Sequence, residues 1–393
     1  MVQDKTDRPY DLVLFGATGF TGGLTADYLA EHAPDGCRWA LAGRNRGKLE
    51  AVRERLAKAH PSAAGLDLLV ADSSDPASLQ EVAASARVVV TTVGPYLLHG
   101  EALVRACAEA GTDYVDLTGE PEFVDRMFLE HHDTAVASGA RIVHACGFDS
   151  VPHDLGAYYT VQQLDADVPI RVRGVVRSNA TFSGGTFHSA LTAMSRARQM
   201  RDAMVARRKK ESRPSGRRSR AIAGKPHRDR LLGYWLLPLP TIDPFIVVRS
   251  GAALPSYGPD FGYSHYAGLK TLRYTVGGLA GVSALAVAAQ VPAVRKALMK
   301  RIKAGDGPSP GRRAKSWFTV DFVGRAGAGR MVHTRVSGGD PGYTETAKML
   351  AESALCLAYD DNPPTSGQVT TAVAMGDALL ARLQAAGIRF EIV

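Results

Sequence analysis

Apolar runs and helix-like patterns alternate along the first 160 residues. Six short apolar runs predict strands, and the continuous β-branched run Val88–Val93 is typical of a strand covered on both faces. Such alternation indicates βαβ units around a parallel sheet. We therefore expect an α/β fold of Rossmann type, with a doubly wound sheet in the strand order 3-2-1-4-5-6. The predicted strands are Tyr10–Phe15, Arg38–Ala42, Leu66–Ala71, Val88–Val93, Thr112–Leu117 and Arg141–Ala145, and the predicted helices include Thr21–Ala33, Asn45–His60, Glu101–Ala110 and Pro121–Ser138.

The pattern changes after about residue 160 and predicts a second, α+β domain over residues 161–337. Val168–Asn179 has the pattern of an exposed strand, and Thr186–Ala206 that of a helix. Two alternating stretches separated by a glycine-rich segment, Trp317–Val323 and Met331–Val336, predict a hairpin. The remaining residues, 338–393, contain two helical patterns, Thr344–Ala358 and Val369–Ala386.

Charge is concentrated in one part of the chain. The 393 residues have an ordinary globular composition, with 22% charged residues, and carry a net charge of +8. Arg196–Arg230, however, holds 14 basic and 3 acidic residues, so the rest of the chain sums to −3. We interpret this segment as a solvated loop, or as a docking surface for an acidic carrier protein or an anionic membrane. No aromatic interleaving accompanies the charge, so we expect no nucleic-acid binding.

A second feature of the later chain is Tyr274–Val294, which runs for 21 residues without a charge and is followed by several lysines and arginines. Three interpretations stay open. The run could be a buried helix, a helix lying in the membrane interface, or a full membrane span.

A glycine-rich turn follows the first predicted strand directly. Residues 16–22 read Gly-Ala-Thr-Gly-Phe-Thr-Gly, and a helix pattern begins within them. Glycines at this spacing let the backbone approach a pyrophosphate, and the amides of the helix N-terminus point at its charge. The alternative is a glycine-rich turn with no ligand. We predict a dinucleotide site made by Gly16, Thr18, Gly19, Phe20 and Gly22.

The end of the second strand distinguishes NAD from NADP. NAD enzymes place an acidic residue there to bind the ribose 2′-hydroxyl, but this chain has Arg44 and no acid before Glu50. Arg44, helped by Lys48 or Arg46, could hold a 2′-phosphate. The alternative is an arginine that faces water at a helix start. We therefore predict NADP(H) as the cofactor.

Two further positions could contact the nucleotide. Asp72, just past the third strand, could reach the adenine edge, or its segment could simply cap the next helix. Gly94, Pro95 and Tyr96 follow the fourth strand, where a nicotinamide would lie. Tyr96 could line that site or serve only as a packing aromatic.

Several motifs together resemble a known family. Gly16–Gly22, Ala40–Arg44, Gly94–Tyr96 and the stretch Gly147–Asp154 (GFDSVPHD) are similar to those of saccharopine dehydrogenase-like oxidoreductases, especially the branch of trans-acting enoyl reductases. The resemblance implies an NADPH-binding Rossmann domain, an α/β second domain and a C-terminal segment that packs back on the first. It also implies reduction of a carbon–carbon double bond on an acyl chain carried by a polyketide or fatty-acid synthase, in complex-lipid (glycolipid) synthesis.

Enoyl reduction needs a hydride from the cofactor and one proton donor from the protein. His153, Asp149, Tyr96 and Glu120 all fall near the carboxyl ends of predicted strands, where the site should open. His153 is the preferred donor at neutral pH, although it could instead be a helix-start histidine bonded to backbone. Asp149 could equally be a cap, and His188 is a further guess from the second domain.

Two other functions remain alternatives. One is a saccharopine dehydrogenase-type C–N oxidoreductase acting on an amino-acid-like substrate, and the other is a non-catalytic NADP-binding scaffold or redox sensor. The four cysteines are far apart and form no metal motif, so we expect no metal site. With a charged, non-apolar N-terminus, they favour a cytoplasmic protein, with the inner face of the plasma membrane as a further possibility.

Overall fold

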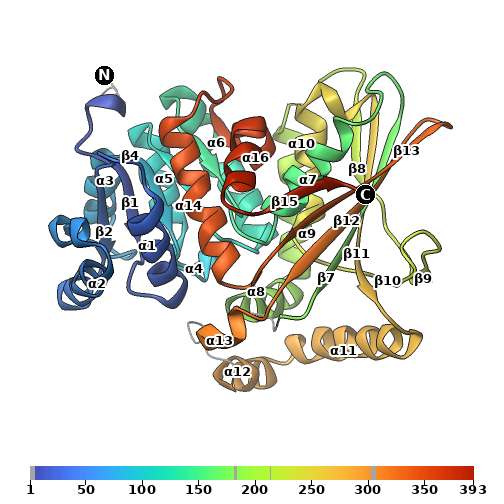
Figure 1. Cartoon of the computed structure of the whole chain (residues 1–393), viewed down its shortest axis with the longest axis horizontal. Coiled ribbons are helices and arrows are strands. Elements are labelled where there is room, and N and C mark those ends of the chain that lie inside the picture. The colour runs from blue at the N-terminus through green and yellow to red at the C-terminus, as the bar shows by residue number, and fades with distance from the viewer. Residues whose placement is uncertain (1–4, 181–183, 213, 302–306) are drawn as a thin grey trace.

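The computed structural model describes residues 5–180, 184–212, 214–301 and 307–393. Two sheets lie side by side, with helices between and around them (Figure 1). The first sheet has the order β14-β6-β5-β4-β1-β2-β3, and each neighbouring pair of strands in it is parallel. The predicted order is confirmed, and a seventh strand extends it. Its strands are β1 (Tyr10–Phe15), β2 (Trp39–Gly43), β3 (Asp67–Val70), β4 (Ala86–Thr91), β5 (Asp113–Val115), β6 (Arg141–Val143) and β14 (Gly367–Val369).

Helices cover both faces of this sheet because its central strands bury side chains on both sides. Leu12 and Leu14 of β1 pack in one core, and Val13 and Phe15 in another. Local signals set the helix ends: Asn45 accepts a hydrogen bond from the Lys48 amide at one helix start. The helices in this part of the chain are α1 (Phe20–His32), α2 (Arg46–Ala59), α3 (Pro76–Ser85), α4 (Tyr96–His99), α5 (Glu101–Ala110) and α6 (Pro121–Ser138), with 3₁₀ turns at Lys5–Asp7 and Pro61–Gly65.

The second sheet is mixed and has the order β15-β13-β12-β7-β11-β10-β9, with β8 also paired to β11. Its strands are β7 (Ile170–Ser178), β8 (Arg218–Ala221), β9 (His227–Arg228), β10 (Trp235–Pro238), β11 (Asp260–Leu269), β12 (Phe318–Ala326), β13 (Arg330–Gly338) and β15 (Arg389–Ile392). The predicted hairpin is β12–β13. The strand expected over 168–179 is β7. It was expected to be exposed, but it lies in the middle of the sheet, between β11 and β12. Its arginines misled the sequence interpretation because they pair with acids of neighbouring segments.

The remaining helices connect the two sheets or lie outside them. They are α7 (Val151–Val161), α8 (Gly184–Ser195), α9 (Ala197–Lys210), α10 (Asp243–Ala253), α11 (Leu272–Gln290), α12 (Pro292–Arg301), α13 (Pro310–Arg313), α14 (Thr344–Tyr359), α15 (Thr371–Ala374) and α16 (Gly376–Ala385), with a 3₁₀ turn at Pro255–Tyr257. The expected helix over 186–206 is two helices that meet at Arg196, and the expected helix over 369–386 is interrupted after Ala374.

The basic segment 196–230 is not a loop. Most of it is α9, β8 and β9, and several of its basic side chains form ion pairs within the protein. Arg196 pairs with Glu122 of α6, while the buried Arg207 pairs with Asp125 of α6 and with Glu211. Glu122 and Asp125 lie 74 and 82 residues before their partners Arg196 and Arg207, so the charge run alone could not reveal these two pairs.

The C-terminal segment returns to both sheets (Figure 1). Helix α14 packs on α1, β4 and β5, and β14 adds to the first sheet beside β6. The last strand, β15, instead pairs with β13 of the second sheet. The expected return to the first domain is therefore confirmed for α14, while β15 was not anticipated.

Helix α7 joins the two halves, and at Gly156 it packs closely on β12 of the second sheet. A Cβ at Gly156 would lie 2.3 Å from the Phe322 ring of β12, so only glycine lets the helix pack at this distance.

We expect Gly156→Ala to lower the free energy of unfolding by roughly 1–3 kcal/mol through overpacking, measured by urea denaturation. Gly277→Ala is the matched control, because Gly277 also lies in a helix but a Cβ there meets nothing within 4 Å. That control should be neutral or slightly stabilising. Equal effects of the two changes would contradict the packing role of Gly156.

Candidate active site

The turn between β1 and α1 has room for glycine only. Gly16 has φ +94°, in the left-handed region, and a Cβ at Gly22 would lie 2.2 Å from the Gly16 carbonyl oxygen. The Gly19 amide donates to that same oxygen at 3.0 Å, and Gly19 begins α1 without a side-chain cap. The backbone amides of the first helical turn are thus left for an outside acceptor. This cradle fits the pyrophosphate of a dinucleotide.

The other predicted loop residues surround the same turn. Thr18 and Gly19 are exposed, and Phe20 is half-buried with its ring edge-on to Tyr343, at a centroid distance of 4.9 Å. Arg44, just after β2, and Lys48, in the first turn of α2, are exposed, and within the described residues neither forms an ion pair. Two uncommitted cations beside the nucleotide turn suit a ribose 2′-phosphate.

Asp72 is already engaged in its own turn. Its carboxylate accepts hydrogen bonds from the Ser74 amide at 2.8 Å and the Ser74 hydroxyl at 2.7 Å. These bonds, the amide bond first, lower the pKa of Asp72 below its usual value. Asp75, not Asp72, caps α3. The geometry therefore agrees with the turn-forming alternative for Asp72.

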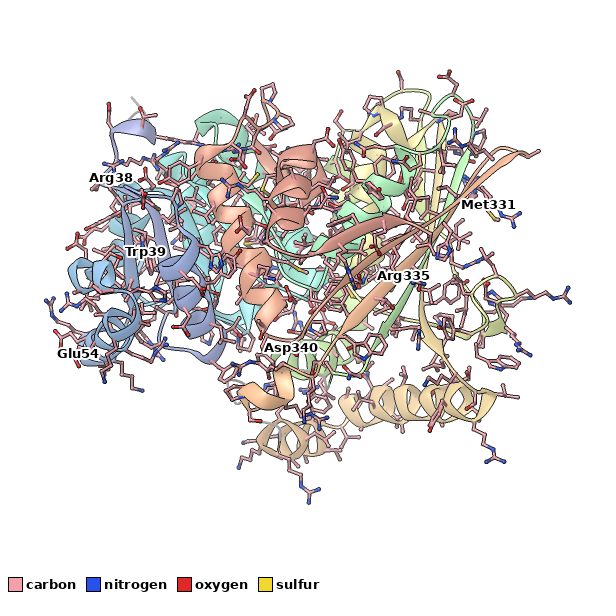
Figure 2. The ribbon with its side chains drawn as sticks, in the orientation of Figure 1. Arg38, Trp39, Glu54, Met331, Arg335 and Asp340 are labelled. Carbon is pink, nitrogen blue, oxygen red and sulfur yellow. The ribbon has the colours of Figure 1, made fainter. Side chains whose placement is uncertain are left out.

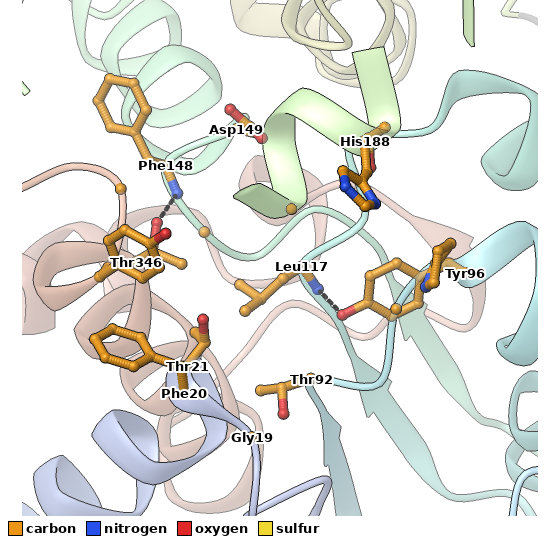
Figure 3. A pocket seen from close by; sticks show the side chains of 18 of the residues that line it. Gly19, Phe20, Thr21, Thr92, Tyr96, Leu117, Phe148, Asp149, His188 and Thr346 are labelled. Atoms are coloured by element: carbon orange, nitrogen blue, oxygen red, sulfur yellow. Dashed lines mark hydrogen bonds between the residues drawn. The ribbon is translucent and has the colours of Figure 1, made fainter. Parts of the chain in front are cut away.

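A pocket of about 270 Å³ opens at the carboxyl ends of β1, β4 and β5, beside the glycine turn (Figure 3). It extends from that turn to α8 and the start of α14. It is lined by Gly19, Phe20, Thr21, Gly22, Thr92, Gly94, Pro95, Tyr96, Leu117, Gly119, Glu120, Gly147, Phe148, Asp149, Gly185, His188, Ser189, Pro341, Gly342, Tyr343 and Thr346.

Tyr96 forms part of the pocket wall but is a poor proton donor. The ring is 5% exposed, its hydroxyl donates to the Thr91 carbonyl at 3.2 Å, and it accepts from the Leu117 amide at 3.1 Å (Figure 3). Burial raises the pKa of Tyr96 well above its usual value. The structure favours the packing alternative, in which Tyr96 fixes the wall formed after β4 and β5.

His153 is not among the described residues that line this pocket, so the geometry gives no support to its expected catalytic role. Only 2% of it is exposed, and its Nδ1 lies 2.9 Å from Oδ1 of Asp243 in α10. The ring of Phe148, edge-on to His153, faces the pocket in its place. Nearness to a strand end in the sequence did not reveal that the first turn of α7 points into the interface between the two sheets.

His153, Asp243 and His265 form one buried cluster. His265 Nε2 lies 3.4 Å from Asp243 Oδ2, which also accepts from the Thr241 hydroxyl. Burial alone would raise the pKa of Asp243, but the two histidines outweigh it and lower that pKa. The donor atoms of the three side chains lie within 4.8 Å of one another, so this cluster could hold a metal ion. A second such group in the described chain, Glu101, Glu130 and His131, is more exposed.

Three other ionisable side chains do line the pocket: Asp149, Glu120 and His188. Glu120 accepts from the amides of Tyr96 at 3.2 Å and Leu97 at 2.9 Å and from the Ser189 hydroxyl at 3.2 Å. Burial, the largest effect, raises the pKa of Glu120. Through its three hydrogen bonds, Glu120 connects α4 and α8 to the segment between β5 and α6. Figure 3 shows Asp149 and His188 on the side of the pocket away from the glycine turn, and a Cβ at Gly119 would meet both Asp149 Oδ2 at 3.3 Å and the Cβ of Ser189 at 3.8 Å.

Sequence reasoning missed the contribution of the C-terminal segment. Thr346 of α14 accepts a hydrogen bond from the Phe148 amide at 3.1 Å, and Tyr343 lines the pocket beside Phe20. No local pattern marks these residues, because they come from a segment nearly 200 positions beyond Phe148.

Comparisons with known proteins agree with this geometry. Residues 12–143 match the family described as saccharopine dehydrogenase NADP binding domain. A candidate trans-acting enoyl reductase of Mycobacterium tuberculosis is 40% identical to the chain, with 98% of each sequence covered. The trans-acting enoyl reductases of Mycobacterium bovis and Mycobacterium ulcerans are each 36% identical, with 97% and 98% of each sequence covered.

A solved structure shows the same fold. The apo saccharopine dehydrogenase (L-Glu forming) of Saccharomyces cerevisiae superposes with a TM-score of 0.55 at 13% identity, covering 98% of this chain and all of that one. Fold and site together define an NADP(H)-dependent oxidoreductase with a Rossmann domain. More narrowly, the chain belongs to the saccharopine dehydrogenase-like family, in the branch of the trans-acting enoyl reductases.

We expect Arg44→Ala to weaken NADPH binding by about tenfold to a hundredfold, since one charged hydrogen bond contributes roughly 1.5–3 kcal/mol. NADH, which lacks the 2′-phosphate, should lose almost nothing. Calorimetric titration with both nucleotides measures this. Lys58→Ala, on the exposed end of α2, is the control and should leave both affinities unchanged. Equal losses for the two nucleotides would remove the 2′-phosphate role of Arg44.

The buried cluster predicts a pH dependence of stability. Burial lowers the pKa of His265 from 6.5 to about 4, so below pH 6.5 the unfolded chain binds a proton that the folded protein does not. The free energy of unfolding should fall by up to about 3 kcal/mol from this group between pH 6.5 and 4. Asp243, whose folded pKa is lowered, adds a loss only as the pH falls below its ordinary value of 3.8.

Urea denaturation at pH 7, 5.5 and 4.5 tests this. His265→Gln should flatten the pH dependence, whereas His99→Gln, at an exposed position, should keep the slope of the unchanged protein. An unaltered slope in His265→Gln would show that the cluster does not control acid stability.

Proposed function

We propose that this oxidoreductase reduces the carbon–carbon double bond of an acyl or polyketide-derived thioester in complex-lipid synthesis. The observation that carries the proposal is the composition of the pocket wall. Among the described residues that line it, none is lysine or arginine, while Phe20, Leu117 and Phe148 are apolar. Such a wall suits an acyl chain, because convergent apolar groups bind apolar ligands.

The same observation disfavours the amino-acid alternative. A saccharopine-like substrate carries several carboxylates, which require arginine or lysine in the pocket. The acids that line this pocket, Glu120 and Asp149, would repel such a substrate.

The reaction requires a hydride at the β-carbon and a proton at the α-carbon. Bound NADPH supplies the hydride. Gly16, Gly19 and Gly22 would hold its pyrophosphate, and Arg44 with Lys48 its 2′-phosphate. Imidazole is the side chain best suited to transfer protons at neutral pH, and His188 is the histidine that lines the pocket. We assign the proton-donating role to His188 in place of His153.

Glu120 and Tyr96 act as positioning residues. Glu120 binds Ser189, the neighbour of His188 on α8, and also the amides that begin α4. Through these bonds the side chain sets the distance between α8 and the wall that Tyr96 completes. The acyl group would arrive as a thioester on a carrier protein or synthase, as the relatives' names suggest by the words trans-acting.

Stopped-flow NADPH oxidation with a panel of enoyl thioesters of different chain length tests the proposal. Turnover that improves with chain length supports acyl reduction. Reduction of NADP⁺ by saccharopine-like amino acids, measured in a second assay in the oxidative direction, would instead favour C–N chemistry. Tight NADPH binding with no turnover in either assay would favour a cofactor-binding scaffold.

For His188 we expect His188→Phe to lower kcat by about 10²- to 10⁴-fold, the range for loss of a general acid. The affinity for NADPH, measured by calorimetry, should stay within a factor of about three. His153→Gln serves as comparison and should lower thermal stability with a much smaller effect on kcat. The reverse ranking of the two variants would return the proton-donating role to His153.

A further inference from the structure

Helix α11 is an apolar helix that the protein leaves uncovered. It is the one helix in the described residues that is long and apolar enough to cross a membrane, yet only 11% of its most apolar window is buried. An internal helix is thereby excluded. Of the 18 exposed large hydrophobic side chains among the described residues, seven lie within 23 positions: Leu272, Tyr274, Val276, Leu279, Val287, Val291 and Val294. Contiguous exposed apolar surface of this kind marks an interaction site.

The inner side of α11 is attached to the rest of the protein. Thr275 and Ala289 are buried, and a Cβ at Gly278 would lie 3.0 Å from Leu237 of β10. The side-chain amide of Gln290 donates a hydrogen bond to the Met194 carbonyl of α8 at 2.7 Å. The outer side faces away from both sheets, and in that view no other element lies beyond it (Figures 1 and 2).

The topology rules out a single membrane crossing. Strand β11 ends at Leu269 before α11, and β12 begins at Phe318 after α12, yet both pair with β7 in the same sheet. The chain must therefore leave and return on one side of any membrane. Helix α12 could not provide a second crossing, since it is ten residues long and carries four basic residues.

The charge beside α11 has a single sign. From Leu272 to Arg301 the chain has five basic residues and no acidic one. Arg273 lies at the start of α11, and Lys296, Lys300 and Arg301 are exposed on α12. An uncharged apolar face flanked by cations is the pattern of a helix that lies in a membrane interface and contacts anionic headgroups.

We propose that α11 and α12 form a platform that docks the protein on an anionic lipid bilayer, with the outer face of α11 in the interface. Helix α8, on which α11 packs, also contributes Gly185, His188 and Ser189 to the pocket. Docking therefore places the pocket wall within one helix layer of the lipid. This link to the acyl substrate rests on the proposed function, whereas lipid docking itself does not.

Sedimentation with vesicles tests docking without any use of enzymatic activity. The full chain should bind vesicles of mixed phosphatidylglycerol and phosphatidylcholine at least tenfold more tightly than vesicles of phosphatidylcholine alone. That preference should shrink as salt is raised. Absence of binding to the mixed vesicles at low salt would overturn the proposal.

Two double variants identify the surface. Val276→Asp with Val287→Asp places charges at positions 60% and 69% exposed, where we expect little effect on folding, and should reduce vesicle binding at least tenfold. Val136→Asp with Leu231→Asp, at positions 46% and 51% exposed elsewhere, is the matched control and should bind as before. Lys296→Glu with Lys300→Glu should remove most of the preference for anionic lipid.

Size-exclusion chromatography of the same variants separates other occupants. If the unchanged protein dimerises and Val276→Asp with Val287→Asp makes it monomeric, α11 binds a second copy and the lipid proposal fails. It fails equally if vesicle binding survives that variant. If the unchanged protein binds vesicles normally but does not reduce enoyl thioesters, the result counts against the proposed function alone.

Discussion

The contact between Gly16 and Gly22 constrains the rest of the structure. It brings α1 against the carboxyl end of β1 so closely that a single methyl group would not fit. The position of this helix determines where its N-terminal amides point. It also leaves open space beyond the carboxyl ends of β1 and β4. Phe20 and Tyr343 then meet beside that space, which joins the C-terminal segment to the nucleotide turn. The pocket exists because these segments converge on one glycine turn.

The first sheet could be predicted from the sequence because its information is local. Buried parallel strands are continuous apolar runs, and short connections restrict their order. The glycine turn was equally visible, since its residues are consecutive. The second sheet was harder. Its central strand β7 carries Arg171 and Arg173, which the sequence shows as polar but the structure neutralises with Asp260 and Asp229.

The catalytic side of the pocket shows the same limit more sharply. His153 stands in a family-like motif next to a strand end, and no local signal distinguishes a pocket histidine from one buried between two sheets. His188 comes from α8 in the other half, in a segment whose pattern suggested only a helix. Glu120 lies just before α6, beyond the carboxyl end of β5, but its role follows from Ser189, 69 residues later. Residues that act together here belong to distant segments, so only the fold brings them together.

The crossing of the C-terminal segment between the sheets has a consequence for synthesis on the ribosome. Helix α14 covers the face of the first sheet that holds Leu12 and Leu14, and β14 supplies its edge beyond β6. While a nascent chain still ends before Thr344, α1 and α2 cover only part of that apolar face, and β6 has an open edge. The N-terminal half cannot complete its fold during translation on its own. It should depend on chaperones, or on temporary association with other surfaces, until the last fifty residues have left the exit tunnel.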